Sequence, residues 1–182
     1  MPSPMLLFSV PGTRLSFRAT LCATENPSVI ALVRDQLPLT SVLGHVVISG
    51  ETFWFPTRTL SLEKGNMVQR QPGDVFYHPA GQTVCFCYGR ITESAKVNKF
   101  GQVFKEDIGN LRATGELVYQ QTVANKDRTI VQIEVSLIEG DEDMDMAVSA
   151  GPPAKGPVMQ DISLVRKAVR IDLLSAYPRS PI

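Results

Sequence analysis

Alternation of apolar and polar side chains along the chain predicts a protein built mainly from β-strands. Residues 15–23 and 129–137 alternate with the period of two that is typical of strands with one buried face. Residues 83–88 are apolar at nearly every position, as expected for a strand covered on both faces. Further strand patterns bounded by turn residues occupy residues 43–49, 51–55, 75–78 and 97–104. Roughly seven or eight strands with closely spaced turns favour a closed barrel or a sandwich.

One segment has the signature of a short helix that caps the strands. Asn26 and Pro27 form a typical helix start, and the apolar side chains that follow have helical spacing. Pro38 marks the end of this helix. Residues 105–121 have a mixed pattern, which predicts a loop with a short helix.

The chain changes character after residue 140, where an acidic run is followed by a glycine- and proline-rich stretch at residues 151–157. Residues 158–176 are apolar again, and their spacing fits a helix or a strand equally well. We therefore expect a barrel domain over residues 1–140, and an acidic linker with a C-terminal arm over residues 141–182. Apolar side chains of a free arm would be unfavourable in water, so we expect two copies to exchange arms in a homodimer.

Composition and charge narrow the possible partners. The 182 residues include 18 Lys and Arg against 18 Asp and Glu, and this balance disfavours nucleic-acid binding. No stretch approaches the roughly 18 apolar residues of a membrane span, and the N-terminus lacks the basic region of a secretory signal. We therefore expect a cytoplasmic protein with no membrane or nucleic-acid partner.

The three cysteines, Cys22, Cys85 and Cys87, are an odd number and favour a reducing compartment. We expect Cys85 and Cys87 to point to opposite faces of their strand, which disfavours both a disulfide between them and a zinc site. No glycine-rich phosphate loop or metal-binding helix motif is present in the sequence. The expectation is a protein with no metal and no cofactor.

Three local strings indicate a family resemblance. Residues 73–81 read Gly-Asp-Val-Phe-Tyr-His-Pro-Ala-Gly, residues 84–89 read Val-Cys-Phe-Cys-Tyr-Gly, and residues 97–103 read Val-Asn-Lys-Phe-Gly-Gln-Val. Together they resemble the cyclophilin-like superfamily, especially its small microbial proteins without assigned function, over about residues 13–138. The resemblance implies a closed cyclophilin-like β-barrel. True cyclophilins carry a Phe-His-Arg string, but residues 53–58 have no His-Arg pair, which disfavours peptidyl-prolyl isomerase activity.

Candidate site residues gather at the ends of the central strands. His78 precedes Pro79 at a strand end, and histidine is the natural acid or base near neutral pH. We expect His78, Tyr77 and Arg58 to be the catalytic candidates. A pocket lined by aromatic side chains with a few polar groups is a typical small-molecule site. The expected substrate-binding residues are Trp54, Tyr88, Glu51, Cys85 and Phe86.

These features favour a cofactor-independent enzyme or binding protein that acts on a small molecule in an aromatic-lined cleft. Lyase, isomerase, cyclase or hydrolase chemistry would suit a site of histidine and tyrosine. Two alternatives remain open, namely a non-catalytic module that binds a peptide or protein partner, and a weak peptidyl-prolyl isomerase.

Overall fold

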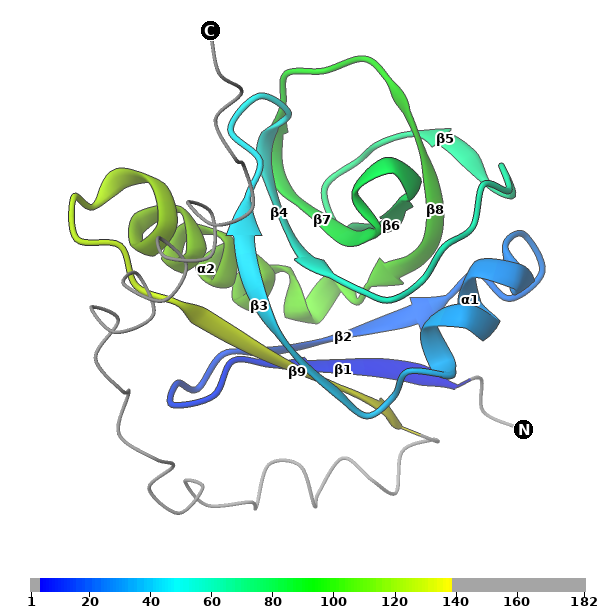
Figure 1. The fold of residues 1–182 in the computed structure, drawn as a ribbon, viewed down its shortest axis with the longest axis horizontal. Coiled ribbons are helices and arrows are strands. Elements are labelled where there is room, and N and C mark those ends of the chain that lie inside the picture. Colours follow the sequence, from blue (N-terminus) through cyan, green and yellow to red (C-terminus); the bar gives the residue numbers. More distant parts are fainter. Residues whose placement is uncertain (1–3, 139–182) are drawn as a thin grey trace, which may run out of the picture. The chain divides into compact units, whose positions relative to one another are not determined.

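A computed structural model of the chain describes residues 4–138, which form a closed antiparallel β-barrel (Figure 1). The strands are β1 (Met5–Ser9), β2 (Ser16–Leu21), β3 (Leu39–His45), β4 (Gly50–Pro56), β5 (Met67–Gln69), β6 (Asp74–His78), β7 (Thr83–Ile91), β8 (Lys96–Val103) and β9 (Val131–Ile138). They lie in one sheet in the order β2-β1-β9-β3-β4-β7-β6-β8-β5, and β2 also pairs with β8. Eight strands therefore close into a ring with β5 outside it, which confirms the prediction of a mainly β, closed barrel.

One edge of β8 is shared between two partners. Residues 101–103 of β8 pair with β2 and close the barrel, whereas residues 96–98 pair with β5. The other edge of β8 pairs with β6. This division brings β5, and the segment that follows it, next to the outer surface of the barrel.

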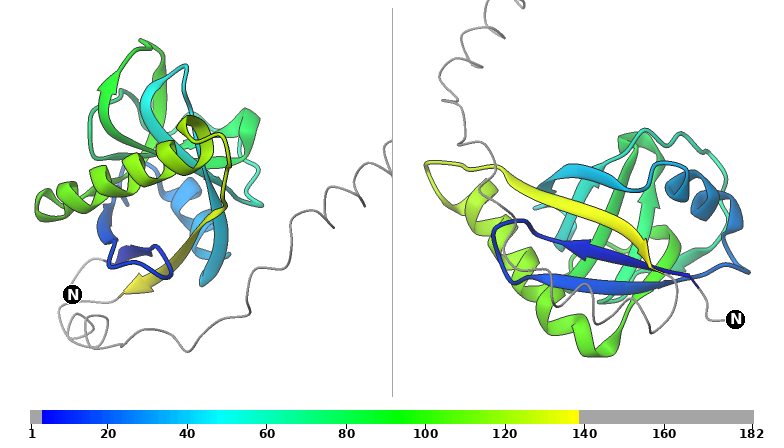
Figure 2. Two further views of the ribbon diagram at one scale, coloured as in Figure 1. Left: turned by 90° about the vertical axis from the view of Figure 1, so that its left-hand side faces the viewer. Right: turned by 90° about the horizontal axis from the view of Figure 1, so that it is seen from below.

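Two α-helices lie at opposite ends of the barrel (Figure 2). Helix α1 (Pro27–Arg34) has Pro27 in its first turn and buries Val29, Ile30 and Val33, as the sequence pattern predicts. Helix α2 (Ile108–Tyr119) is longer than the short helix expected between residues 105 and 121. Single helical turns complete the secondary structure at η1 (Pro79–Gly81), η2 (Lys105–Asp107) and η3 (Gln120–Ala124).

The barrel interior is filled by aromatic rings. Phe86 of β7 lies at the centre, with its ring centroid 4.8 Å from that of Phe53 and 5.0 Å from that of Phe8. Phe17 and Phe55 complete the cluster, and all five rings are almost fully buried. Because the rings pack against each other in stacked and edge-on geometries, the interior is a packed core and not a ligand cavity.

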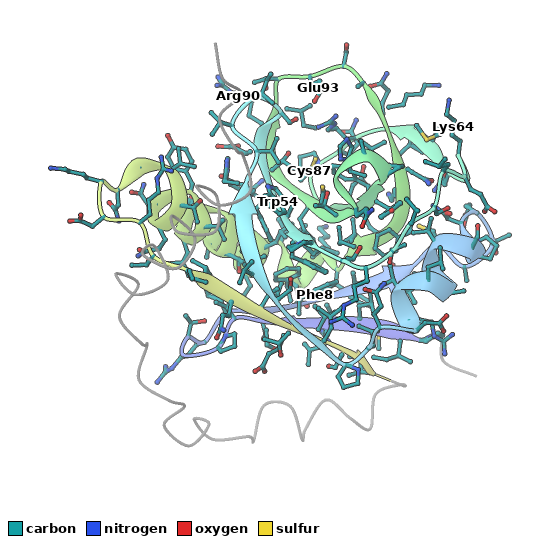
Figure 3. All side chains as sticks on the ribbon, viewed as in Figure 1. Phe8, Trp54, Lys64, Cys87, Arg90 and Glu93 are labelled. Carbon is teal, nitrogen blue, oxygen red and sulfur yellow. The ribbon has the colours of Figure 1, made fainter. Side chains whose placement is uncertain are left out.

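The strands β4, β6, β7 and β8 carry a second apolar cluster on their opposite face. It contains Phe76, Cys85, Cys87 and Val97, with Trp54 packed against them. Figure 3 labels Trp54 and Cys87 on this part of the molecule, and Phe8 marks the interior cluster. Phe53 and Phe55 of β4 therefore face the interior, whereas Trp54 lies on the opposite face of the same strand.

The expectation for the two neighbouring cysteines is wrong. Cys85 and Cys87 lie on the same face of β7, because residues two apart on a strand share a face. Both thiols are buried and free, and Cys22 is also free.

Several strand boundaries differ from the sequence pattern. Strand β3 begins at Leu39 and ends at His45, because residues 39–43 pair with β9. Strand β7 continues through Gly89 to Ile91, where the Glu51 carboxylate of neighbouring β4 accepts a hydrogen bond from the Arg90 N–H. Strands β1 and β5 are additional to the strands expected from sequence.

The described residues do not include the acidic linker, the C-terminal arm or its proposed exchange in a homodimer, all of which concern residues 141–182. Within residues 4–138, neither helix has the length and apolar character that crossing a membrane requires.

Candidate functional site

A pocket of about 660 Å³ lies over the second apolar cluster. Its wall is formed by side chains from four strands, namely Trp54 of β4, Phe76 of β6, Cys85 of β7 and Val97 of β8. These residues alternate with core residues along each strand, so the fold presents them together on one face. The volume and the mainly apolar wall are typical of a small-molecule site.

A buried cation forms the polar end of this pocket. Arg70 follows β5 and is only 7% exposed, and its guanidinium lies 5.5 Å from the centroid of the Phe76 ring. Its Nη2 donates to Glu93 Oε2 at 3.2 Å and to the Ala95 carbonyl at 3.4 Å. The buried Nε of Arg70 has no hydrogen-bond partner among the described residues.

Glu93 is the carboxylate that holds this arginine. The Ser49 hydroxyl donates to Glu93 Oε2 at 2.7 Å, and this hydrogen bond, together with the charge of Arg70, lowers the pKa of Glu93. Glu93 is therefore ionised at neutral pH. Figure 3 labels Glu93 on the segment between β7 and β8, with Lys64 on the segment that leads into β5.

Four of the residues predicted from sequence line this pocket, and four do not. The pocket contains Trp54, Tyr77, His78 and Cys85. The others lie elsewhere: Phe86 is in the aromatic interior, Tyr88 packs against α2, and Arg58 and Glu51 are exposed outside the pocket.

Tyr77 and His78 face opposite sides of β6, as the alternation predicts. Tyr77 borders the pocket but is 1% exposed, and its hydroxyl donates to the Thr59 carbonyl at 2.7 Å. His78 is exposed at the pocket rim, where Nδ1 accepts a hydrogen bond from the Gly81 N–H at 3.2 Å. Of the two, only His78 has a side chain that solvent or a ligand reaches freely.

The pocket cysteine is not an activated nucleophile. Burial raises the pKa of Cys85 to about 12, so its thiol is protonated at neutral pH. Burial also raises the pKa of Cys87. Residues 4–138 contain no group of three or more His, Cys, Asp or Glu side chains placed to bind a metal ion.

A second polar pair lies away from the pocket, beneath α2. His45 Nε2 and the Tyr88 hydroxyl are 2.9 Å apart, and the Tyr119 ring of α2 contacts His45 edge-on at 5.1 Å. Burial, with the nearby carboxylates Glu51 and Glu116, raises the pKa of Tyr88 to about 12. Burial also lowers the pKa of His45, although the charge of Glu51 opposes this effect.

The lowered pKa of His45 predicts that acid destabilises the barrel. The unfolded chain takes up a proton near the ordinary histidine pKa of about 6.5, whereas folded His45 does so only at lower pH. The contribution of neutral His45 to stability is therefore present above about pH 6.5 and is lost as the pH falls below it. Urea unfolding at several pH values should show this decrease.

The control for this prediction uses the two histidines of the chain. His45→Asn should reduce the loss of stability between neutral and mildly acidic pH, whereas His78→Asn keeps His45 and should retain its contribution. An unchanged pH dependence in His45→Asn would contradict the assignment. The quantity to compare is the change in the free energy of unfolding with pH, because loss of the hydrogen bond to Tyr88 lowers the stability of His45→Asn at every pH.

Sequence reasoning missed the polar end of the pocket. Arg70, Glu93 and Ser49 come from three separate segments that the pairing of β5 with β8 and of β4 with β7 brings together. One local signal was available. Val68 and Arg70 are two residues apart, so alternation along an extended segment places both side chains on the same face, toward the second apolar cluster.

The comparisons with known proteins concern the fold. No protein-family model matches the chain, and a search of the curated proteins finds no match. The chain is similar to McbB, whose structure was solved in complex with tryptophan, with a TM-score of 0.66 and 18% identity. The similarity covers 97% of this chain but only 57% of McbB.

A second solved structure is that of the hypothetical protein AF2241 from Archaeoglobus fulgidus, with a TM-score of 0.50 and 18% identity. The similarity covers 75% of this chain and 96% of AF2241. At these identities, both similarities support the barrel fold and carry no activity over. The narrower cyclophilin-like assignment stays a prediction.

Proposed function

We propose that this barrel binds a small organic molecule in the pocket over β4, β6, β7 and β8. The observation that supports the proposal is a pocket of about 660 Å³ with an apolar wall and a buried arginine at one end. The packing of the barrel interior does not require a cavity on the outside of these strands. Apolar surface exposed to water there is unfavourable unless a ligand covers it. The tryptophan complex of the structurally similar McbB is consistent with a small-molecule ligand.

The contacts of the pocket residues favour binding over catalysis. The Tyr77 hydroxyl donates to a backbone carbonyl, the Cys85 thiol is protonated, and His78 Nδ1 already accepts a backbone N–H. An enzymatic role of the lyase, isomerase, cyclase or hydrolase type would need His78 to act through Nε2 from the rim. Loss of turnover in His78→Asn with unchanged ligand affinity would support that narrower proposal.

The experiment uses the single tryptophan of the chain, which lies in the pocket wall. Ring compounds without an indole group should change the fluorescence of Trp54 on binding, and calorimetry should report binding of tryptophan itself. Val97→Phe replaces an isopropyl group of the pocket wall with a larger aromatic ring and should weaken binding of every ligand found.

Val42→Phe is the matched control, since it makes the same change on the exposed surface of β3 and outside the pocket. It should bind as the wild-type protein does. If no compound binds, or if Val97→Phe binds every ligand as tightly as Val42→Phe does, the pocket is not the binding site.

A further inference from the structure

We infer that the ligand carries a carboxylate and that Arg70 receives it, with the apolar body of the ligand against Trp54 and Val97. This inference rests on the proposed function, because it names the chemical class of molecule that the same pocket takes.

Arg70 is an incompletely paired buried cation. Glu93 and the Ala95 carbonyl both accept from the same terminal nitrogen, Nη2, while the buried Nε has no partner within residues 4–138. Leaving a buried donor of a charged group unpaired is unfavourable, and such groups in native proteins call for a partner. Because Arg70 lines the pocket, a ligand oxygen there would pair with the guanidinium, and a carboxylate matches the planar geometry of arginine better than any neutral group.

The position of this guanidinium is held before any ligand arrives. Glu93 binds one nitrogen, and the guanidinium carbon lies over the ring of Phe76. Because the arginine is already ordered, little conformational entropy is lost when a ligand pairs with it. The Glu93 oxygen that binds Arg70 also accepts from Ser49, so it is already occupied by two donors and is a poor site for a ligand ammonium.

The charges around the pocket also favour an anion. The lining contains three cations, Lys64, Arg70 and Lys96, against two carboxylates, Glu63 and Glu93. These five side chains leave an excess of one positive charge. The remainder of the wall is mainly apolar, so the ligand that fits is a monocarboxylate with a ring or a branched apolar body.

The experiment compares acids with their neutral amides, because each pair differs only in the group that meets Arg70. Suitable pairs are benzoate with benzamide and 3-phenylpropionate with 3-phenylpropionamide, titrated against the Trp54 fluorescence of the wild-type protein. A charge-assisted hydrogen bond predicts that the acids bind about tenfold to a hundredfold more tightly than the amides. Amides that bind as tightly as the acids, or 2-phenylethylamine that binds more tightly, would overturn the inference.

Variants of the arginine give the second measurement. Arg70→Met keeps an unbranched apolar stem and removes the guanidinium with its charge, so it should abolish the preference for the acid within each pair. Arg70→Lys keeps the charge and loses the planar fork, and it should retain part of the preference. Should Arg70→Met fail to fold, the acid and amide pairs in the wild-type protein still decide the question.

The outcomes separate this inference from the proposed function. If each acid binds as tightly as its amide, and Val97→Phe weakens the binding of both, the pocket assignment stands and the inference of a carboxylate ligand is refuted. Absence of binding by every acid and amide would refute both. A preference for acids that survives in Arg70→Met would place the carboxylate elsewhere and refute the role of Arg70.

Discussion

Replacing Phe86 with alanine is expected to lower the free energy of unfolding by about 3–5 kcal/mol, which is a large part of the stability of a domain of this size. The Phe86 ring is fully buried and contacts the rings of Phe8, Phe17, Phe53 and Phe55. Removing it leaves a cavity at the centre of the barrel, because the four surrounding rings, on three different strands, cannot all move inward to fill it. Urea unfolding followed by circular dichroism measures the loss.

The control for Phe86→Ala is Ile48→Ala, which removes an apolar side chain that is 84% exposed between β3 and β4. A surface change of this kind should alter the free energy of unfolding by no more than about 0.5 kcal/mol. A loss of less than about 1 kcal/mol in Phe86→Ala would contradict the packed aromatic interior.

Replacing Gly115 with alanine should destabilise the protein even though alanine is the better helix former. A Cβ at this position of α2 would lie 2.5 Å from Cγ of Tyr88, whose ring is buried beneath the helix. Either α2 or the Tyr88 ring must then move. We expect this overpacking to outweigh the gain in helix propensity of about 1 kcal/mol, with a net loss of about 1–2 kcal/mol.

Gly109 offers a matched control on the same helix. A Cβ at Gly109 would meet nothing within 4 Å, so Gly109→Ala should leave the free energy of unfolding unchanged or raise it by up to about 1 kcal/mol. Opposite signs in thermal or urea unfolding of the two variants would confirm the close approach of α2 to the barrel. Equal stabilisation by both variants would contradict it.

The strands that sequence predicts best are those whose two faces differ in polarity. Strand β9 alternates buried and exposed residues along most of its length, and its sequence shows the same alternation. Strand β1 was missed because four of its five residues are apolar, so the alternation of its burial is hidden in the sequence. Helix α2 was underestimated for a different reason. Its two glycines weaken the helical pattern, and one of them is needed only because Tyr88 packs there.

The apolar wall of the pocket is more predictable than its polar end. Trp54, His78 and Cys85 could be proposed from sequence because each lies on a strand with a clear pattern. The bond between Arg70 and Glu93 joins residues 23 positions apart, and it depends on strand pairings that no local pattern reveals. From sequence alone, a charged residue on a short segment is predicted to be exposed, because charged side chains are rarely buried.

Residues that face the interior alternate along β4, β6 and β7 with residues that face the pocket, so mutational tolerance should alternate along these strands as well. In β7, substitutions at Val84 and Phe86 act on folding, whereas those at the intervening Cys85 act on what the pocket accepts. Ligand preference can therefore diverge among descendants of this barrel by point substitution without loss of the fold. Insertion or deletion of a single residue within these strands exchanges the two faces and would be eliminated by selection.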